Sequence, residues 1–537
     1  CDIMRKYLLE NKKNLIIYII ICFFAAILSA GTAFLYQKLT FFAVAKEFKK
    51  LIFFGFIAIP YLTIEAMFDY FPRKFKSKII NNIIKKLRED LIIKIDREDI
   101  SYLNLDYKKD LKNKMINDLE AINNYFNGIL SSLLYIFMFF ISLLSAIYIQ
   151  GTLTFIMLLL SFIPFLSPFI SRKILSNKKE EELDSKSAYL ENFDEFSENI
   201  LFIKISKLGS YFNNKLGELA DILKDKSIIF ESSLAKTFAI SYGLGNILYS
   251  GTWIIGGFFV YKNLIDLPSL IAMTTLMVTI AGPIQSISDS YSGIISSKKI
   301  FDKYLEYLEE TNIDKGTVEI GKIDKLRFDN VDLKFANNCI IKNINLEIKS
   351  GNKCLILGDS GSGKSSFLNL ILGIFANENK KIFINGYALS QLNKKSYYEN
   401  IYFIPQDTII FTGSIIDNIT LFDEDKNYDK CLKILDMVGL NYLIKNRNLN
   451  FNIDKTTLSG GEKKRIDLAR AIYSDKSMII IDEVTSGLDT YNENLVAQII
   501  KEIENKIIIC VSHSTNPNLL NSFNRKLKIE NKKIYQF

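Results

Sequence analysis

The residues Gly358-Asp-Ser-Gly-Ser-Gly-Lys-Ser365 are the clearest indication of the fold of the C-terminal half of this 537-residue chain. It follows the apolar run of residues 353–357, which is typical of a buried strand, and it leads into a helical pattern over residues 364–372. A glycine-rich loop between a strand and a helix is the pattern of a phosphate-binding loop, because its backbone N–H groups and the helix N-terminus face the phosphates. Lys364 is then expected to reach the β- and γ-phosphates of a nucleotide, and Ser365 to coordinate Mg²⁺.

A second apolar run, Met478-Ile-Ile-Ile-Asp482-Glu483, ends in two carboxylates. In an open α/β sheet, ligands bind beyond the carboxyl ends of the strands, which places Asp482 beside the phosphate-binding loop as a Mg²⁺ ligand. Glu483 is then placed to orient and polarise an attacking water. Taken alone, such a strand more often ends in solvated acids, and it is the phosphate-binding loop that favours the catalytic interpretation.

The only histidine, His513, directly follows the strand-like residues 507–512. A lone histidine is usually packed or surface-lying, but this one lies at the predicted sheet edge that carries the phosphate-binding loop, so a contact with the γ-phosphate is favoured. From residue 320 onward, β-rich runs alternate with amphipathic helices. This pattern predicts a parallel sheet with crossover helices, whose strands include 326–335, 353–357, 478–482 and 507–511.

The N-terminal half carries apolar runs of about 20 residues, the length that a helix needs to cross a bilayer. Six spans are predicted, at residues 15–37, 51–72, 128–149, 152–170, 236–261 and 267–288, with a tight turn at Gln150-Gly151 between the third and the fourth. The long loops 73–127 and 171–230 are rich in Lys, so the positive-inside rule places them in the cytoplasm. Residues 1–14 are basic and partly apolar, which predicts an interfacial helix on the inner membrane face.

The composition narrows the function classes. Hydrophobic residues make up 49% of the chain and charged residues 23%, which fits a membrane part joined to a soluble part. The net charge of +8 is attributed to Lys-rich inner loops, because no basic stripe with interleaved aromatic residues occurs outside the apolar half, and no nucleic-acid partner is expected. The six cysteines form no CxxC pair, which argues against a zinc site and a disulfide framework.

With these motifs, the stretch Leu458-Ser-Gly-Gly-Glu462 resembles the signature of the ATP-binding cassette (ABC) family, over residues 320–537. The apolar half resembles the membrane domain of multidrug and peptide exporters of this family, through its layout and the short sequences Asn117-Asp118 and Ala281-Gly-Pro-Ile284. The resemblance implies a multi-domain membrane protein with a six-helix all-α transmembrane domain and an α/β P-loop NTPase domain. The expected parts are an interfacial helix at 1–14, a transmembrane domain at 15–305, a linker at 306–319 and the cassette at 320–537.

The resemblance also implies ATP and Mg²⁺ as ligands, and roles for single positions. Phe335 matches the aromatic residue that stacks on adenine, and Gln406 matches the glutamine that touches the metal and senses the membrane domain. Ser459 and Gly461 match residues that bind the γ-phosphate of the nucleotide held by the opposite subunit. The implied nucleotide-contacting set is Phe335, Gly358, Asp359, Ser360, Gly361, Ser362, Gly363, Lys364, Ser365, Ser366, Gln406, Ser459, Gly460, Gly461 and Asp489. The implied metal ligands are Ser365, Gln406 and Asp482, and the implied catalytic residues are Lys364, Glu483 and His513.

Four features depart from the family pattern, one of which is that the sequence ends at Phe537, soon after the last strand, without the closing helix that is usual. The signature ends in Glu462 where Gln is usual, and Gly487 stands where Ala is usual in the loop that links the two sites. Residues 452–455 lack the Gly-Glu-x-Gly pattern of many such exporters. That stretch contacts the membrane domain in the family, so the details of coupling stay open.

Cassettes of this family close face to face over two ATP molecules, so the resemblance implies a dimer, either of two identical chains or with a similar partner chain. Short helices near 100–112 and 199–210 are expected to rest on the cassettes, the second on the opposite subunit. The expected function is ATP-driven export of a peptide, lipid or amphipathic small molecule across the cell membrane. An ATP-gated channel or receptor regulator is the alternative, against which the intact Glu483 and His513 argue. An importer would need a binding protein or a substrate-capture domain.

Two acidic residues of the second span bear on the cargo. An acidic group at mid-membrane is costly, so Glu65 either contacts a cationic cargo in a wet cavity or is hydrated near the helix end. Asp69 fits the hydrated helix end. The Lys-, Asn- and Ile-rich composition resembles that of an AT-rich bacterial genome.

Overall fold

The computed structural model describes residues 2–100, 105–309, 316–335, 338–375, 378–446, 449–483 and 489–537. They form two compact units. The first consists of Cys1–Ile93 and Asp110–Glu310, and the second consists of Lys94–Lys109 and Thr311–Phe537. The division after Glu310 falls within the predicted linker of residues 306–319. The short segment Lys94–Lys109, from the first long loop, belongs to the same unit as the predicted cassette.

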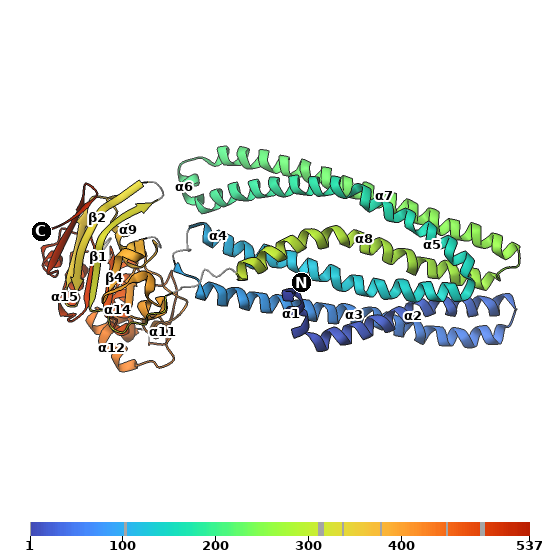
Figure 1. The fold of residues 1–537 in the computed structure, drawn as a ribbon, viewed down its shortest axis with the longest axis horizontal. Helices are drawn as coiled ribbons and strands as arrows, with labels where there is room; N and C mark the ends of the chain where they lie inside the picture. The colour runs from blue at the N-terminus through green and yellow to red at the C-terminus, as the bar shows by residue number, and fades with distance from the viewer. Residues whose placement is uncertain are drawn as a thin grey trace. The chain divides into compact units, whose positions relative to one another are not determined.

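The first unit is helical (Figure 1). Its helices are α1 (Asp2–Glu10), α2 (Lys12–Val44), α3 (Phe48–Arg97), α4 (Leu105–Asn113), α5 (Leu119–Glu198), α6 (Ile200–Ile205), α7 (Gly209–Tyr261) and α8 (Leu267–Glu309), with a π-helical turn η2 (Lys114–Asp118) before α5. The last residues of α3 and the first residues of α4 belong to the second unit. The backbone of α5 leaves the helical region at Gln150 (φ −160°, ψ 102°), so the predicted turn is a kink between two helices. The two short helices expected near 100–112 and 199–210 correspond to α4 and α6, although residues 101–104 lie outside the described chain.

Five helical segments of the described chain are long and apolar enough to cross a membrane. They are Lys12–Val44, Phe48–Arg97, Asp110–Ser161, Gly209–Tyr261 and Leu267–Ile284. The predicted span 152–170 continues α5 beyond the kink, into residues 162–173 whose side chains are not described, so a sixth span stays a prediction. Large apolar side chains such as Phe53 and Ile254 are 63% and 74% exposed, and such surfaces need an apolar environment.

Small residues let the long helices pack closely. Ala26, Ala30 and Ala33 of α2 are almost fully buried, and the last two pack in one apolar cluster with residues of α5 and α8 such as Met157 and Leu276. Small side chains allow the backbones of membrane helices to approach each other. The predicted interfacial helix, α1, is tied to α3, because the Tyr7 hydroxyl donates a hydrogen bond of 2.8 Å to Asp90.

The second unit is built on a six-stranded sheet in the order β12-β11-β3-β10-β9-β6. Its strands are β3 (Lys353–Gly358), β6 (Ile401–Ile404), β9 (Met478–Asp482), β10 (Ile507–Val511), β11 (Arg525–Glu530) and β12 (Lys533–Gln536). All pairs are parallel except the edge pair of β11 and β12. The predicted strands 353–357, 478–482 and 507–511 are therefore confirmed, and their nearly unbroken apolar runs suit strands covered on both faces.

A separate antiparallel sheet corrects the prediction that 326–335 belongs to the parallel sheet. This sheet has the order β2-β1-β4-β5, with β1 (Lys325–Phe335), β2 (Asn338–Lys349), β4 (Ile382–Ile384) and β5 (Tyr387–Ala388). Leu326 and Phe328 are buried while Arg327 and Asp329 are not, and this alternation is typical of an antiparallel strand with one covered face. The next strand, β2, follows without a crossover helix, which an antiparallel pair permits.

Helices cover the sheets of the second unit (Figure 1). They are α9 (Lys364–Ile371), α10 (Lys394–Tyr398), α11 (Ile415–Thr420), α12 (Tyr428–Met437), α13 (Asn441–Asn446), α14 (Gly460–Ser474), α15 (Thr490–Glu502) and α16 (Pro517–Leu520). One apolar core joins α9 and the antiparallel sheet to one face of the parallel sheet, as in the pair Phe328–Phe367. A second core joins α11, α12, α14 and α15 to the parallel sheet. A short pair of strands, β7 (Gly413–Ser414) and β8 (Asn452–Ile453), lies beside α11.

Candidate nucleotide-binding site

The phosphate-binding loop connects β3 to α9 as the sequence predicts. Gly361 and Gly363 adopt φ values of +79° and +99°, which residues other than glycine rarely adopt. A Cβ atom on Gly363 would also lie 2.4 Å from Cγ2 of Ile340. The Ser362 N–H donates a hydrogen bond of 3.1 Å to the Asp359 carbonyl, which closes the turn. The loop conformation therefore depends on glycine at these two positions.

Lys364 is buried at the first position of α9. Its Nζ donates hydrogen bonds of 2.9 Å to the Gly358 carbonyl and 2.8 Å to the Asp359 carbonyl, so the loop holds its own lysine. Burial lowers the pKa of Lys364, and the nearby carboxylates of Glu483, Asp359 and Asp482 oppose this shift. The ammonium group thus lies inside the curve of the loop, where a bound anion would replace the two carbonyls as its hydrogen-bond acceptor.

Asp482 ends β9 beside this loop. The Ser365 hydroxyl on α9 lies 3.3 Å from Oδ1 of Asp482, within hydrogen-bond distance. Burial raises the pKa of Asp482, whereas the Ser365 hydrogen bond and the charge of Lys364 oppose that rise. Hydroxyl and carboxylate oxygens are ligands that Mg²⁺ prefers, so the pair fits this ion. Among the described residues, no group of three or more His, Cys, Asp or Glu is arranged to hold a metal ion by itself, so phosphate and water oxygens would have to complete the coordination.

Glu483 follows Asp482 with a left-handed backbone, φ +54°. A residue other than glycine persists in this region only where its surroundings fix it, at a cost of about 1–3 kcal/mol. Both carboxylate oxygens are engaged: Oε2 accepts a hydrogen bond of 3.0 Å from Gln406 Nε2, and Oε1 lies 3.2 Å from His513 Nε2. The backbone N–H donates to the Val511 carbonyl at 3.0 Å. The orientation of the Glu483 carboxylate is therefore fixed by Gln406 and His513.

The sheet order explains why these residues meet. Gln406 follows β6, Glu483 follows β9 and His513 follows β10, and the three strands are neighbours and parallel. Their carboxyl ends therefore lie at one edge of the sheet, where β3 delivers the phosphate-binding loop. The structure brings together the predicted residues Lys364, Ser365, Gln406, Asp482, Glu483 and His513, and the loop Gly358–Gly363.

The other predicted residues are placed differently. Ser459 and Gly460 are exposed, and the Ser459 side chain caps α14 by accepting a hydrogen bond from the Glu462 N–H, while Oε2 of Glu462 accepts one from the Ser459 N–H at 2.7 Å. In the part of the chain that the structure describes, Ser459 has no recorded contact with the phosphate-binding loop. The Glu462 that departs from the family pattern thus completes a capping box.

Three further predicted positions stay without a structural test. Asp489 caps α15 through the Asn492 N–H at 2.8 Å, which is a structural role. Residues 484–488 before it, with the predicted linking loop, lie outside the described residues. Phe335 ends β1, but its side chain lies outside the described part. Ser366 is half-buried in the first turn of α9.

The sequence interpretation missed a buried network behind the signature. Arg470 and Asp467 of α14 form an ion pair of 2.8 Å with both side chains 3% exposed. The Arg470 guanidinium also donates to the carbonyls of Asn418 at 2.6 Å and Ile409 at 2.7 Å. This network fastens α14 to the segment after Gln406. The sequence signal for this network was the presence of two charged residues, Asp467 and Arg470, among the buried apolar positions of the helix, such as Ile466 and Ala469.

Lys464 of α14 was missed as well. Its Nζ donates a hydrogen bond of 3.3 Å to the backbone carbonyl of Glu483. Residues 464 and 483 lie in different elements, so no local spacing rule relates them. Nothing in the sequence pattern pointed to this contact.

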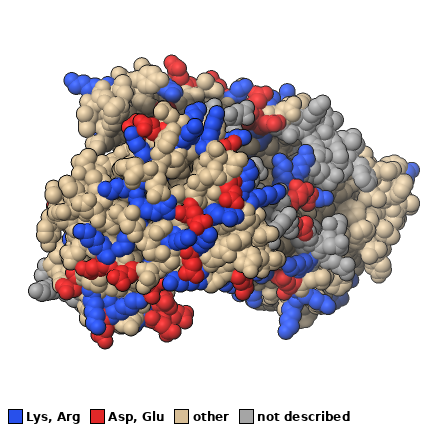
Figure 2. All heavy atoms as spheres, turned by 60° about the vertical axis from the view of Figure 1, so that its left-hand side comes forward, with Lys and Arg blue, Asp and Glu red and all other residues tan. Residues whose placement is uncertain are grey.

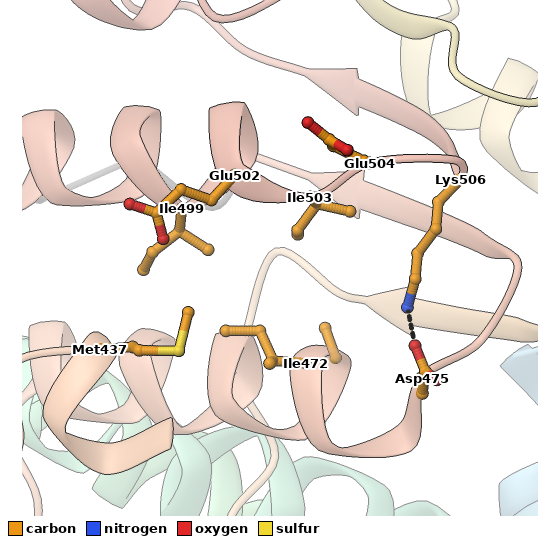
Figure 3. Close-up of a pocket in the computed structure, with 9 residues that line it drawn as sticks. Met437, Ile472, Asp475, Ile499, Glu502, Ile503, Glu504 and Lys506 are labelled. Carbon is orange, nitrogen blue, oxygen red and sulfur yellow. Dashed lines mark hydrogen bonds and ion pairs between the residues drawn. The ribbon is translucent and has the colours of Figure 1, made fainter. Parts of the chain in front are cut away.

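A cavity of about 200 Å³ lies between α12, α14 and α15 (Figure 3). Apolar side chains line it from opposite sides, with Ile472 facing Ile499 and Ile503. Lys506 makes an ion pair of 2.6 Å with Asp475 at one end of the cavity. The residues lining this cavity in the described chain include none of the predicted nucleotide-contacting set. The cavity therefore takes no part in the phosphate chemistry.

The surface charge is mixed. Figure 2 shows Lys and Arg side chains interspersed with Asp and Glu over the viewed face. A nucleic-acid-binding face would instead gather basic side chains into a stripe or patch. This face therefore offers no such footprint.

Fold and site define a P-loop nucleotide-binding unit joined to a helical membrane unit. Residues 15–284 match the ABC transporter transmembrane region, and residues 341–486 match the ABC transporter family. The chain belongs to the ABC transporter family, as an exporter-type half-transporter in which the transmembrane region precedes the cassette. It is a multi-pass membrane protein, and the predicted fold class is confirmed.

Similar proteins support the same family. A Rickettsia conorii protein described as an export ATP-binding/permease protein is 26% identical over 543 residues, covering 95% of this chain and 91% of that protein. A Bacillus subtilis protein described as a multidrug resistance ABC transporter is 24% identical, covering 81% of this chain and 66% of that protein. Among solved structures, a bacterial Atm1-family ABC exporter with ATP bound has a TM-score of 0.80 at 16% identity, covering 97% of this chain and 94% of that chain.

Proposed function

We propose that two copies of this chain form an exporter in which ATP binding and hydrolysis drive a peptide, lipid or amphipathic small molecule across the bacterial cell membrane. The observation that carries the proposal is the placement of Glu483. Its carboxylate is held by Gln406 and His513 at the sheet edge that presents Lys364 and Asp482. A regulatory protein without turnover would not require these groups together.

The residues divide the work of hydrolysis. The N–H groups of the loop Gly358–Gly363 and the Lys364 ammonium bind the β- and γ-phosphates. Ser365, Asp482 and Gln406 would hold Mg²⁺, which would neutralise charge at the phosphate oxygens. Glu483 orients the attacking water, and His513 contacts the γ-phosphate. Phe335 stacks on adenine.

The exposed signature supports a dimer. Ser459 and Gly460 lie at the N-terminus of α14, where free backbone N–H groups favour an anion. The solvent-facing position of Ser459, with its hydroxyl used as a helix cap, suits a phosphate delivered by a second chain. Each ATP is then held between the phosphate-binding loop of one chain and the signature of the other, with Asp489 beside the dimer interface.

Helix α6 supports the same assembly. Leu201, Phe202 and Ile205 are 71%, 65% and 73% exposed, while Ile203 is buried. Three exposed large apolar residues on a six-residue helix need a partner surface. The occupant proposed here is the cassette of the second copy, so that separation of the cassettes moves α5 and α7, which α6 joins.

The acidic residues of α3 contribute little to a choice of cargo. Asp69 makes an exposed ion pair of 2.9 Å with Arg73 one turn away, which suits a hydrated helix end. Glu65 is half-buried and keeps both interpretations. Stimulation of hydrolysis by candidate cargoes is the direct way to choose among peptide, lipid and small molecule.

The test is ATP hydrolysis by the purified protein in lipid. Glu483→Gln removes the charge that orients water but keeps the shape, so the rate is expected to fall about a hundredfold or more while MgATP binding persists. Glu504→Gln, at a cavity-lining residue just beyond the end of α15, is the matched control and is expected to keep the wild-type rate. An inactive wild-type protein, or an active Glu483→Gln variant, would refute the proposal.

A further inference from the structure

Glu483 has one backbone group whose partner comes from an unexpected element. Its N–H is held by Val511 and its carboxylate by Gln406 and His513. The remaining polar group, its carbonyl oxygen, accepts the hydrogen bond from Lys464 Nζ. Because φ of Glu483 is +54°, its carbonyl points where a regular strand extension would not place it. An unpaired carbonyl there would favour relaxation of the backbone.

Lys464 is suited to this contact by charge as well as distance. Its side chain is half-buried on α14, and burial lowers the pKa of Lys464. The negative charges of Glu483 and Asp407 act in the opposite direction and favour the ammonium form. The ammonium therefore bonds to the residue after Asp482 and is close enough to the residue after Gln406 to feel its charge. Both of these segments belong to the hydrolysis site.

Helix α14 also begins at the signature. Ser459 caps its N-terminus, and Lys464 stands one turn and a half further along the same helix. The helix is fastened by the buried pair of Asp467 and Arg470 to the segment after Gln406. A displacement of the Ser459 end is therefore carried along a rigid element to the Lys464 ammonium.

We propose that Lys464 is a positioning residue that fixes the backbone of Glu483. Because Lys464 belongs to α14, its hydrogen bond to Glu483 depends on the position of that helix. The inference rests on the proposed function and deepens it. When Ser459 engages the nucleotide of a second chain, α14 moves with it, and Lys464 passes this change to Glu483 of its own chain. Engagement at one ATP site thereby acts on hydrolysis at the other.

The first test separates positioning from folding. Lys464→Met keeps the aliphatic stem but removes the donor, and kcat for MgATP is expected to fall about tenfold or more, with KM within about twofold and an unchanged melting temperature. Lys464→Arg keeps a charged donor and is expected to recover most of the rate. Lys463→Met makes the same change one residue away and is expected to match the wild type.

Three outcomes would count against Lys464. Full kcat in Lys464→Met, in a preparation whose wild-type protein hydrolyses ATP, would overturn this inference alone and leave the proposed function intact. Parallel losses of kcat, nucleotide affinity and melting temperature, without rescue by Lys464→Arg, would show a structural role instead. A wild-type protein without hydrolysis would overturn the proposed function, and the inference with it.

The second test addresses the connection along α14. In a double-mutant cycle of Ser459→Ala and Lys464→Met, the combined loss in kcat is expected to be at least threefold smaller than the product of the single losses, because both changes interrupt one route. Losses that multiply would show two independent effects and would overturn the connection.

Discussion

The phosphate-binding loop and the signature segment are both polar, glycine-rich starts of helices, yet the chain treats them in opposite ways. The loop is closed on itself, with Lys364 bonded to its own carbonyls and Glu483 held from both sides. The signature faces outward, with Ser459 exposed at the start of α14. The side chains of the loop region find their hydrogen-bond partners within the chain, whereas the signature segment presents an exposed surface. This difference is what the proposed shared ATP site requires, because each chain would then contribute one closed half and one open half.

The largest effect is expected where the closed region is broken. Gly363→Ala would force a Cβ atom into Ile340 and strain a backbone at φ +99°. The loop would lose its shape, so MgATP binding, measured by equilibrium titration, is expected to weaken more than tenfold. Gly321→Ala, where no heavy atom lies within 4 Å of the added Cβ, is the control. Equal MgATP affinity in the two variants would contradict the geometry described for the loop.

The second effect is expected at the support of the open region. Arg470→Met leaves the buried Asp467 without its counter-ion and is expected to lower stability by about 3–5 kcal/mol. Burial raises the pKa of Asp467, and loss of Arg470 would raise it further. A carboxyl whose pKa is raised on folding costs stability when ionised, so the deficit should shrink as the pH falls.

Thermal unfolding of the whole protein between pH 5 and 8 measures this effect. Replacing both partners with apolar residues, as in Arg470→Met with Asp467→Leu, is expected to recover part of the loss, because no charge is then left buried. A single variant as stable as the wild type at every pH would show that the pair does not support α14.

The smallest effect is expected at the N-terminus of another helix of the cassette unit, α11. Hydrogen bonds from Lys426 and Ser414 lower the pKa of Asp417 to about 2, below the ordinary value near 3.8. A depressed carboxyl pKa contributes stability that is present above about pH 4 and is lost as the pH falls toward 2. Asp417→Asn is expected to cost about 1 kcal/mol at neutral pH, as the loss of a capping-box carboxylate does.

The pH dependence checks the cause of this small effect. The difference in melting temperature between Asp417→Asn and the wild type should narrow between pH 4 and pH 3. A constant difference over that interval would mean that the carboxylate charge is not what stabilises the start of α11.

The elements of the cassette unit differ in how far the sequence alone predicts them. The loop, β9 and β10 were predictable because an apolar strand, glycines and a helix in a fixed order have one common meaning. The assignment of β1 to the parallel sheet was wrong, because its alternating pattern was grouped with neighbouring strands before its partners were known. The strands β2, β6, β11 and β12 and the short strands β4, β5, β7 and β8 were not foreseen.

The site was predictable in its residues and not in its supports. Lys364, Asp482, Glu483 and His513 lie in motifs, so their types and order were enough. Lys464 touches Glu483 across the fold, and such a contact depends on how α14 packs against the sheet edge rather than on local spacing. The positive φ of Glu483 likewise has no sequence signal, since the residue is not a glycine.

We propose that each ATP site is shared between two chains, and mixing two inactive variants distinguishes a shared site from one that is complete in a single chain. Lys364→Ala spoils the closed region and Ser459→Arg spoils the open one, so neither variant alone should hydrolyse ATP. Mixed dimers would contain one site with both halves intact. Co-assembly in equal amounts is expected to restore hydrolysis, up to roughly a quarter of the wild-type rate, because about half of the dimers are mixed and each has one site with both halves intact. The coupling through Lys464 lowers the recovered rate below a quarter, because the chain with the intact loop carries Ser459→Arg. No recovery, in dimers shown to contain both variants, would contradict a shared site.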